Sequence, residues 1–334
     1  MRLPMTQFWI GAAVILTGLA LAGIGLVLMR YFREIRAARQ RLANLGSQVI
    51  ETDCGPIEYA RVGQGYPVLV VHGAIGGFDQ GLFLARNIDV THCQVISVSR
   101  FGYLRTPLPA GAMLDSQADA FASVLDALGI RQAAVFAVSA GSTSALRFAA
   151  RHPGRVQALV LLSPDAPGET YMALPPRFVF DRLMRSDFFY WLMITFFGKK
   201  LRTWMSLVPR GHVLTPQDAE LINNVLAGDL PVSQRMDGTV FETYTLWDEL
   251  MASVTPASPY PLNRIETPTL VINAANDPIS IPENVRRMAG QLPNARLYIV
   301  PDGGHLLFGH AEEVKAEISS FLHDHTEQFH TGGA

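Results

Sequence analysis

Residues 134–146 read AVFAVSAGSTSAL, a pattern typical of a tight turn from a strand into a helix. An apolar run leads through Ser139 into a helix-like segment. Such a turn needs small residues two positions to either side of the serine, here Ala137 and Gly141, because larger side chains would clash where the backbone folds back. The turn would hold the Ser139 hydroxyl clear of the sheet and direct the backbone N–H of Ala140 toward developing negative charge. Ser139 is therefore a candidate nucleophile.

Short apolar runs alternate with helix-length periodic segments on both sides of this turn. The alternation predicts an α/β fold with a mostly parallel central sheet of about eight strands and helices on both faces. The predicted strands are 48–52, 57–62, 67–71, 94–99, 134–138, 156–162, 268–273 and 296–300. The predicted helices are 115–128, 141–151, 282–290 and 311–323.

The alternation stops for about 100 residues between Pro164 and Thr267, far longer than an ordinary connection in such a fold. This aromatic-rich, helix-like stretch predicts an inserted cap. Its run FFYWLMITFF at 188–197 is apolar on every face, which favours packing against protein, with a substrate tunnel or a membrane contact as alternatives. The predicted division is an anchor and basic linker at 1–46, a core at 47–164 and 267–326, a cap at 165–266, and a flexible tail at 327–334.

Composition narrows the class of protein. The chain has 334 residues, of which 49% are apolar and 17% charged, which excludes disordered, collagen-like and coiled-coil proteins. A net charge of −2 gives no basic field for phosphate backbones, so no nucleic-acid partner is expected. The two cysteines, Cys54 and Cys93, form no metal-spaced pair and are either free thiols or one bridge.

The N-terminal stretch at 8–29, FWIGAAVILTGLALAGIGLVLM, carries no charge and has the length of a membrane-spanning helix. A single-pass anchor is favoured. The alternative is a cleaved secretory signal, but its candidate site, Ala20-Leu21-Ala22, lies inside the apolar stretch rather than after it. Arginines cluster after the span, which predicts a catalytic domain in the cytoplasm; export after cleavage is the alternative.

The segment that follows the span, 30–45, has an apolar helical face. Ile35, Ala38, Leu42 and Leu45 lie on this face. The pattern indicates either an amphipathic stalk lying along anionic lipid headgroups or a solvated linker helix.

Four further motifs lie just beyond predicted strands. They are HGAIGG at 72–77, SRFGY at 99–103, Asn276-Asp277-Pro278 and Gly303-Gly304-His305. Together with the serine turn they resemble the α/β-hydrolase superfamily over nearly everything from residue 48 onward, in particular capped members with a serine nucleophile such as esterases, lipases and C–C bond hydrolases. Two departures are Ala137, where the family most often has glycine, and the segment 104–106, where many members continue with glycine and serine.

A serine hydroxyl needs a base to take its proton and a carboxylate to orient that base. The resemblance implies that His305 is the base and Asp277 the acid. Asp165 is the alternative acid, because some members of the superfamily place it there. His310 is a second candidate for the base. It is disfavoured because it lies at the start of a predicted helix.

The glycines of the HGAIGG loop allow it to approach the nucleophile closely. The resemblance implies that the N–H of Ala74 or Ile75, with Ala74 favoured, joins the N–H of Ala140 in an oxyanion hole, and that His72 braces this loop. Substrate contacts are expected at four apolar positions: Ile75, Phe78, Val138 and Leu306.

The expected activity is hydrolysis of a carboxylic ester with a hydrophobic acyl or aryl group, through an acyl-enzyme. C–C bond hydrolysis, lactone opening and peptide hydrolysis on the same scaffold are alternatives, and a non-catalytic, membrane-anchored binding protein is an alternative of another class. Relatives that cleave haloalkanes or epoxides have aspartate at the position of Ser139, which disfavours those reactions. No cofactor is implied, because HGAIGG lacks the dinucleotide-binding spacing, and no cluster has metal-ligand spacing.

Overall fold

The computed structural model describes residues 5–89, 91–166, 176–205, 207–209, 211–246 and 262–326. A helix of 40 residues, α1 (Met5–Asn44), precedes an α/β unit. The strands are β1 (Gln48–Thr52), β2 (Gly55–Val62), β3 (Tyr66–Val71), β4 (Cys93–Val98), β5 (Ala133–Val138), β6 (Val156–Leu162), β7 (Thr269–Ala274) and β8 (Ala295–Val300). The helices around them are α2 (Phe78–Leu84), α3 (Leu114–Ala127), α4 (Gly141–Arg151), α10 (Pro282–Gln291) and α11 (Ala311–Thr326). The predicted tail at 327–334 lies outside the described residues.

The strands form one sheet in the order β1-β2-β4-β3-β5-β6-β7-β8. The pairs β1–β2 and β2–β4 are antiparallel, and the strands from β4 to β8 pair in parallel. The predicted mostly parallel sheet of eight strands is confirmed. The strand order reverses beside β3, because β4 lies on one side of it and β5 on the other. Ligands in open α/β sheets bind beyond the carboxyl ends of the strands at such a point.

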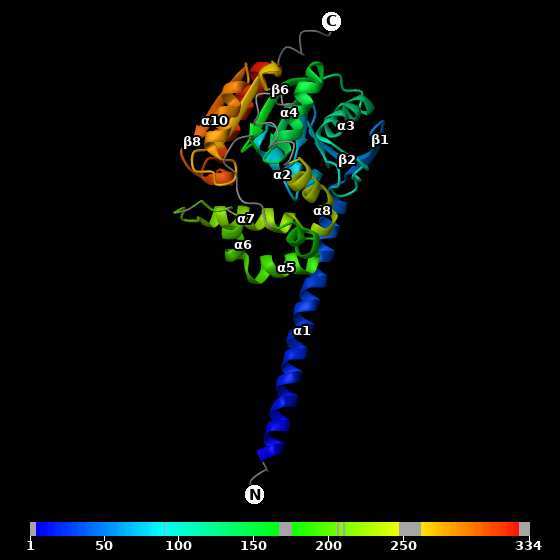
Figure 1. Cartoon of the computed structure of the whole chain (residues 1–334), viewed down its shortest axis with the longest axis vertical. Coiled ribbons are helices and arrows are strands. Elements are labelled where there is room, and N and C mark those ends of the chain that lie inside the picture. The colour runs from blue at the N-terminus through cyan, green and yellow to red at the C-terminus, as the bar shows by residue number, and fades with distance from the viewer. Residues whose placement is uncertain are drawn as a thin grey trace.

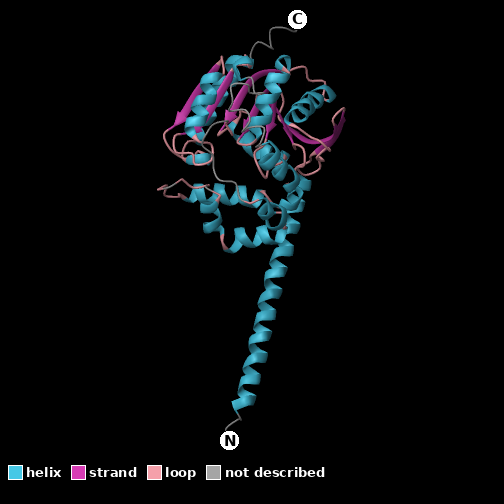
Figure 2. Ribbon diagram, viewed as in Figure 1, coloured by secondary structure: helices cyan, strands magenta, loops and turns pink. Residues whose placement is uncertain are grey.

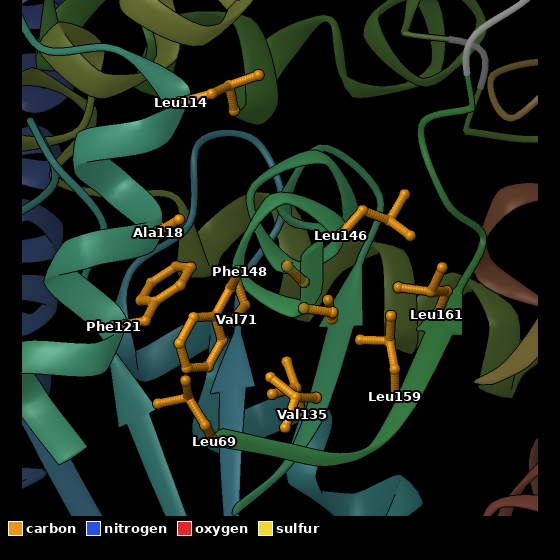
Figure 3. Close-up of a cluster of buried hydrophobic side chains, with 14 of the residues drawn as sticks. Leu69, Val71, Leu114, Ala118, Phe121, Val135, Leu146, Phe148, Leu159 and Leu161 are labelled. Atoms are coloured by element: carbon orange, nitrogen blue, oxygen red, sulfur yellow. The ribbon is translucent and has the colours of Figure 1, made fainter. Parts of the chain in front are cut away.

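Helices lie on both faces of the sheet (Figure 2). Side chains alternate between these faces and form two separate cores. One face packs Leu69 and Val71 of β3 against aromatic side chains of α3 and α4, Phe121 and Phe148, as Figure 3 shows. The other face packs the intervening β3 residues against α11. Burying one such side chain contributes about 1.5–3 kcal/mol, so the central strands are held firmly from both faces.

A helical insertion lies between β6 and β7, at 163–268. It contains α5 (Asp187–Phe196), α6 (Gly198–Trp204), α7 (Pro216–Gly228) and α8 (Met236–Val240), with helical turns at Val179–Met184, Val232–Gln234 and Phe241–Leu246. Figure 1 shows α5, α6 and α7 on the side of the sheet from which α1 extends. The hydroxyls of Ser186 and Thr215 cap α5 and α7 by accepting hydrogen bonds from backbone N–H groups in the first turn.

Only part of the apolar run 188–197 packs against protein. Tyr190 and Trp191 are fully buried, whereas Phe188, Phe196 and Phe197 are 36%, 52% and 45% exposed. Packing on every face of this run is therefore not observed.

The first part of α1 is fully exposed in the structure. Of the described helices, α1 alone is long and apolar enough to cross a membrane. Membrane anchors and signal sequences share these properties.

The second part of α1 packs against the helical insertion. Ile35 and Ala38 are 4% and 5% exposed and belong to one apolar cluster with Tyr190 and Trp191. The indole nitrogen of Trp191 donates a hydrogen bond of 2.7 Å to Glu34. For Ile35 and Ala38 neither lipid headgroups nor solvent is the neighbour, because an amphipathic face does not specify which apolar surface covers it. Leu45, on the same predicted face, is 40% exposed.

Candidate active site

Ser139 lies on the turn between β5 and α4. Its φ of 50° is in the left-handed region, which is strained for a residue with a side chain and is typical of functional turns. The turn is fixed by a hydrogen bond of 3.0 Å from the Ser139 N–H to the carbonyl of Leu162. A Cβ at Gly141 would lie 2.4 Å from the carbonyl oxygen of His72, so only glycine fits there. The small neighbours predicted from the sequence thus have a steric cause.

His305 follows β8 on a turn made by two glycines. Gly303 and Gly304 have φ of 95° and 59°, and a Cβ at Gly303 would come within 2.7 Å of the Phe308 backbone. This turn points the imidazole at Ser139: Nε2 of His305 lies 3.1 Å from Oγ of Ser139.

Asp277 follows β7 and completes the contact on the other side of the imidazole. Its Oδ2 lies 3.0 Å from Nδ1 of His305. Its Oδ1 accepts hydrogen bonds of 2.8 and 2.9 Å from the N–H groups of Ile279 and Ser280. The buried carboxylate is therefore held in one orientation, with one oxygen left for the imidazole.

The environment of His305 favours its protonated form. Burial lowers the pKa of His305, but the charge of Asp277, its hydrogen bond and the charge of Asp165 outweigh burial and raise the pKa above 6.5. In the neutral form, a proton on Nδ1 satisfies Asp277 and leaves the lone pair of Nε2 for the Ser139 hydroxyl. This tautomer is assigned from the hydrogen-bond partners.

Asp165, the alternative acid, contacts the serine turn through its backbone. Its N–H donates a hydrogen bond of 3.2 Å to the Ser139 carbonyl. Desolvation raises the pKa of Asp165 to about 6, although the charge of His305 acts in the opposite direction. Of the two carboxylates, it is Asp277 that bonds to His305 in the described part of the chain.

His310, the second candidate for the base, lies at the start of α11 and makes a different set of contacts. Its Nε2 lies 2.7 Å from Asp302, and its Nδ1 bonds to Glu313. Both partners are largely exposed side chains. His310 therefore belongs to a surface cluster.

His72 is fully buried behind the HGAIGG loop. Nδ1 donates a hydrogen bond of 2.8 Å to the carbonyl of Gly73, and Nε2 accepts one of 3.1 Å from the N–H of Arg100. Burial, with the nearby charge of Arg100, holds the pKa of His72 well below 6.5. A neutral imidazole that donates on one side and accepts on the other matches the bracing position expected for this residue.

The loop that His72 holds runs directly beside the nucleophile. A Cβ at Gly73 would lie 3.3 Å from the Cβ of Ser139. The side chain of Gln80 accepts a hydrogen bond of 2.8 Å from the Gly73 N–H. Ala74 follows in this loop, and Ala140 lies at the N-terminal end of α4. Both proposed oxyanion donors are thus on segments adjacent to Ser139.

The four predicted substrate contacts differ in their accessibility. Val138 and Leu306 are half-buried beside the serine and the histidine. Ile75 is 7% exposed and packs in the apolar cluster that joins α1 to the insertion. Phe78 is 1% exposed, so direct contact with a substrate is not available to it in this structure.

Arg100 was not expected from the sequence to support the site. It is buried, donates a hydrogen bond of 2.9 Å to the Gly73 carbonyl and pairs with Glu242 of the insertion. Burial lowers the pKa of Arg100 to about 10, which still leaves it charged at neutral pH. Tyr103 donates a hydrogen bond of 2.6 Å to the same Glu242 carboxylate. The signal available in the sequence is an arginine placed directly after an apolar strand, in SRFGY.

Residues 104–106, which depart from the family pattern, contact both β2 and the insertion. The hydroxyl of Thr106 accepts a hydrogen bond of 2.9 Å from the N–H of Glu58, and Arg105 forms an ion pair of 2.7 Å with the Glu58 carboxylate. The N–H of Leu104 donates to the carbonyl of Gln234 in the insertion. The role of these residues is therefore to join β2 to the insertion.

The structure also shows the state of the two cysteines and which side chains could surround a metal ion. Cys54 and Cys93 are free thiols, which excludes a bridge between them. Within the described ranges, no three His, Cys, Asp or Glu side chains lie together as they would around a metal ion.

Comparison with known proteins identifies the family. Residues 66–311 match the alpha/beta hydrolase fold family. The chain belongs to the α/β-hydrolase family. A solved α/β-hydrolase fold protein from Nakamurella multipartita is 30% identical, with a TM-score of 0.64 over 83% of this chain and 99% of that one.

Two curated relatives match shorter parts of this α/β-hydrolase. An uncharacterised hydrolase, YcgS of Bacillus subtilis, is 34% identical over 35% of this chain and 40% of its own length. A poly(3-hydroxyalkanoate) depolymerase of Ectopseudomonas oleovorans is 28% identical over 60% of this chain and 64% of its own length. The chain thus spans less than two thirds of either relative, and their likeness supports hydrolase activity in general.

Proposed function

We propose that this α/β-hydrolase cleaves carboxylic esters, with Ser139 as nucleophile, His305 as base and Asp277 as the acid that orients it. The observation that carries the proposal is the continuous chain of contacts from Oγ of Ser139 through both nitrogens of His305 to Asp277, with distances of 3.1 and 3.0 Å. This is the arrangement that activates a hydroxyl near neutral pH.

The reaction has two balanced halves. Oγ of Ser139 attacks the carbonyl carbon while its proton passes to Nε2 of His305, and the tetrahedral intermediate then expels the alcohol, which takes that proton. Water next attacks the acyl-enzyme and gives a proton to Nε2. Collapse of the second intermediate releases the carboxylic acid and returns the proton to Ser139. Asp277 stabilises the imidazolium in both halves.

The N–H groups of Ala74 and Ala140 are the proposed oxyanion donors. Ala140 benefits from the N-terminal end of α4, where backbone N–H groups carry partial positive charge. A donor of this kind contributes about 3–4 kcal/mol to transition-state stabilisation in comparable enzymes. His72, Gln80 and Arg100 hold the Ala74 loop from behind.

The proposed substrate carries a hydrophobic acyl or aryl group beneath the insertion, which we propose acts as a cap over 165–266. The insertion reaches the catalytic turn, because a Cβ at Gly304 would lie 2.5 Å from the ring of Pro209. Val138 and Leu306 are apolar, half-buried side chains next in sequence to the reacting groups. The monomers of a poly(3-hydroxyalkanoate), the polymer in the name of one relative, are joined by carboxylic esters.

We further propose that α1 anchors the hydrolase in a membrane with the catalytic domain in the cytoplasm. The exposed apolar surface of residues 9–29 and the arginines that follow it support this orientation. Intact mass of the membrane-bound protein tests the anchor, because signal cleavage after Ala22 would remove the first 22 residues. Protease protection in sealed vesicles tests the orientation.

Activity-based labelling tests the catalytic proposal. A fluorophosphonate is expected to label the wild-type protein, and both Ser139→Ala and His305→Ala to abolish labelling. Ester hydrolysis is then measured over acyl chains from acetate to octanoate, beside lactones, aryl amides and C–C bond substrates. A clear preference for acetate contradicts the hydrophobic acyl site, and hydrolysis confined to another panel member overturns the ester assignment. Absence of both labelling and turnover indicates a binding protein.

A further inference from the structure

Three exposed aromatic side chains lie on α5 and at the corner where it meets α6. Phe188, in the first turn of α5, is 36% exposed, and Phe196 and Phe197, at the corner, are 52% and 45% exposed. Exposed lysines, Lys199 and Lys200, follow directly at the start of α6. An exposed aromatic group bordered by cationic side chains is typical of a surface that binds a partner rather than water.

The position of α5 along α1 indicates what that partner is. Tyr31 of α1 contacts Phe188 edge-on, with ring centroids 5.1 Å apart, and Glu34 accepts the hydrogen bond from Trp191. The apolar span ends at Met29. Because a helix rises 1.5 Å per residue, the contact at Tyr31 lies about 3 Å beyond the end of the span.

The face of the insertion that points away from the sheet lies on the side of the apolar span of α1. Figure 1 shows α5 as the outermost helix of the insertion, crossing the direction of α1 where its free part begins, with α6 between α5 and α7. Arg30 and Arg33 lie at this level of α1 with 49% and 77% of their side chains exposed. Both arginines lie within ion-pair distance of Glu34, so the proposed membrane boundary carries a net positive charge beside the contact between Tyr31 and Phe188.

We propose that the exposed side of residues 188–200, with Phe188, Phe196 and Phe197, lies in the headgroup region of an anionic phospholipid bilayer. Phenylalanine rings enter the boundary between headgroups and acyl chains, and the lysines and arginines pair with lipid phosphates. The inference rests on the proposed membrane anchor and adds a second contact, made by the insertion itself. The surface of the insertion opposite the sheet is then covered by lipid.

Site-directed fluorescence tests this contact in the full-length protein in nanodiscs of phosphatidylglycerol and phosphatidylcholine. Phe196→Cys and Phe197→Cys are each labelled with an environment-sensitive NBD dye, and quenching by lipids with a nitroxide near the headgroup is measured. Met29→Cys is the control for the span, and Met113→Cys, 51% exposed at the start of α3, is the control for a surface away from it. Unsubstituted protein gives the background from Cys54 and Cys93.

Quenching at positions 196 and 197 is expected to approach that at 29 and to be several times stronger than at 113. It is expected to fall when phosphatidylcholine replaces phosphatidylglycerol, and to fall in phosphatidylglycerol when Lys200→Glu is added. Turnover of a water-soluble ester verifies that each variant is folded.

Each contrary result has a distinct meaning. Quenching at 29 with only background quenching at 196 and 197 overturns the lipid contact and leaves the anchor in place. Background quenching at 29 overturns the anchor itself. A third result would be a dye at position 196 whose emission is blue-shifted but not quenched, and whose shift is seen only in discs that hold two copies of the protein. This result would assign the corner to contact between copies and overturn the proposal.

Discussion

Arg235 of the insertion forms a buried ion pair with Asp79 of α2 through two hydrogen bonds of 2.9 and 2.8 Å. The same guanidinium donates a hydrogen bond of 2.6 Å to the carbonyl of Gly76, in the loop that carries the proposed oxyanion donor Ala74. The insertion therefore holds the shape of this loop directly.

Loss of the Arg235 cation is expected to destabilise the fold. Arg235→Met leaves the Asp79 carboxylate buried without its partner, which costs about 3–5 kcal/mol in comparable proteins. Denaturant unfolding of the purified protein in detergent measures the loss. Arg185→Met is the matched control, because its pair with Asp237 is exposed and should contribute about 0–1 kcal/mol. Equal effects of the two substitutions would contradict a structural role for the buried pair.

Substitution of the two candidate acids is expected to affect kcat very differently. Asp277→Asn should lower kcat by about 10⁴-fold, because the amide cannot hold the catalytic tautomer or stabilise the imidazolium. Asp165→Asn should retain kcat within about tenfold, because Asp165 does not bond to the imidazole in this structure. Steady-state kinetics on a soluble ester measures both. A larger loss in Asp165→Asn would reassign the acid.

The acid limb of the pH profile is expected to report His305. The base acts only when neutral, so kcat/KM falls as pH drops through the His305 pKa, which lies above 6.5. The charge of Asp165 raises this pKa, so Asp165→Asn should move the limb to lower pH. Asp302→Asn, next to His310 at the surface, should leave the limb unchanged. A limb that moves upward in Asp165→Asn would refute the assignment.

Steric demands on the serine turn differ on its two sides. Gly141→Ala would drive a methyl group to within 2.4 Å of the His72 carbonyl, so a loss of both stability and kcat is expected. Ala137→Gly should retain kcat and cost only about 0.5–1 kcal/mol of stability, because glycine weakens a strand without altering the turn. Thermal unfolding and ester kinetics distinguish the two. Normal kinetics in Gly141→Ala would show that the turn can relax.

Truncation at two points should separate the span from the packed part of α1. A chain that begins at residue 30 keeps Tyr31, Ile35 and Ala38 and is expected to be folded, active and recovered without detergent. A chain that begins at residue 47 uncovers the apolar cluster around Trp191 and should aggregate or unfold at lower temperature. Size-exclusion chromatography and thermal unfolding compare them. Equal stability of the two chains would show that the packing of α1 is dispensable.

The sheet was predictable because each central strand is covered on both faces. Such strands read as uninterrupted apolar runs, and the eight observed strands lie within two residues of the predicted bounds. The predicted Ser139, His305 and Asp277 lie together because the carboxyl ends of parallel strands share one edge of the sheet.

The contacts of the insertion were not predictable in the same way. The apolar positions Ile35 and Ala38 indicate a face to be covered, but periodicity does not say whether lipid, water or α5 covers it. Arg100 and Arg235 are arginines, a residue type that is mostly exposed unless it is paired. Their burial depends on Glu242 and Asp79, which are far away in the chain and whose pairing follows only from the folded arrangement.

One side chain of α1 joins this helix to the insertion by hydrogen bonds. The guanidinium of Arg41 donates hydrogen bonds of 3.0–3.2 Å to three carbonyls at the end of α7, those of Ala227, Gly228 and Leu230. Hydrogen bonds and apolar packing thus tie the second part of α1 to the insertion. Any displacement of the insertion from the sheet therefore has to carry α1 with it or break these contacts.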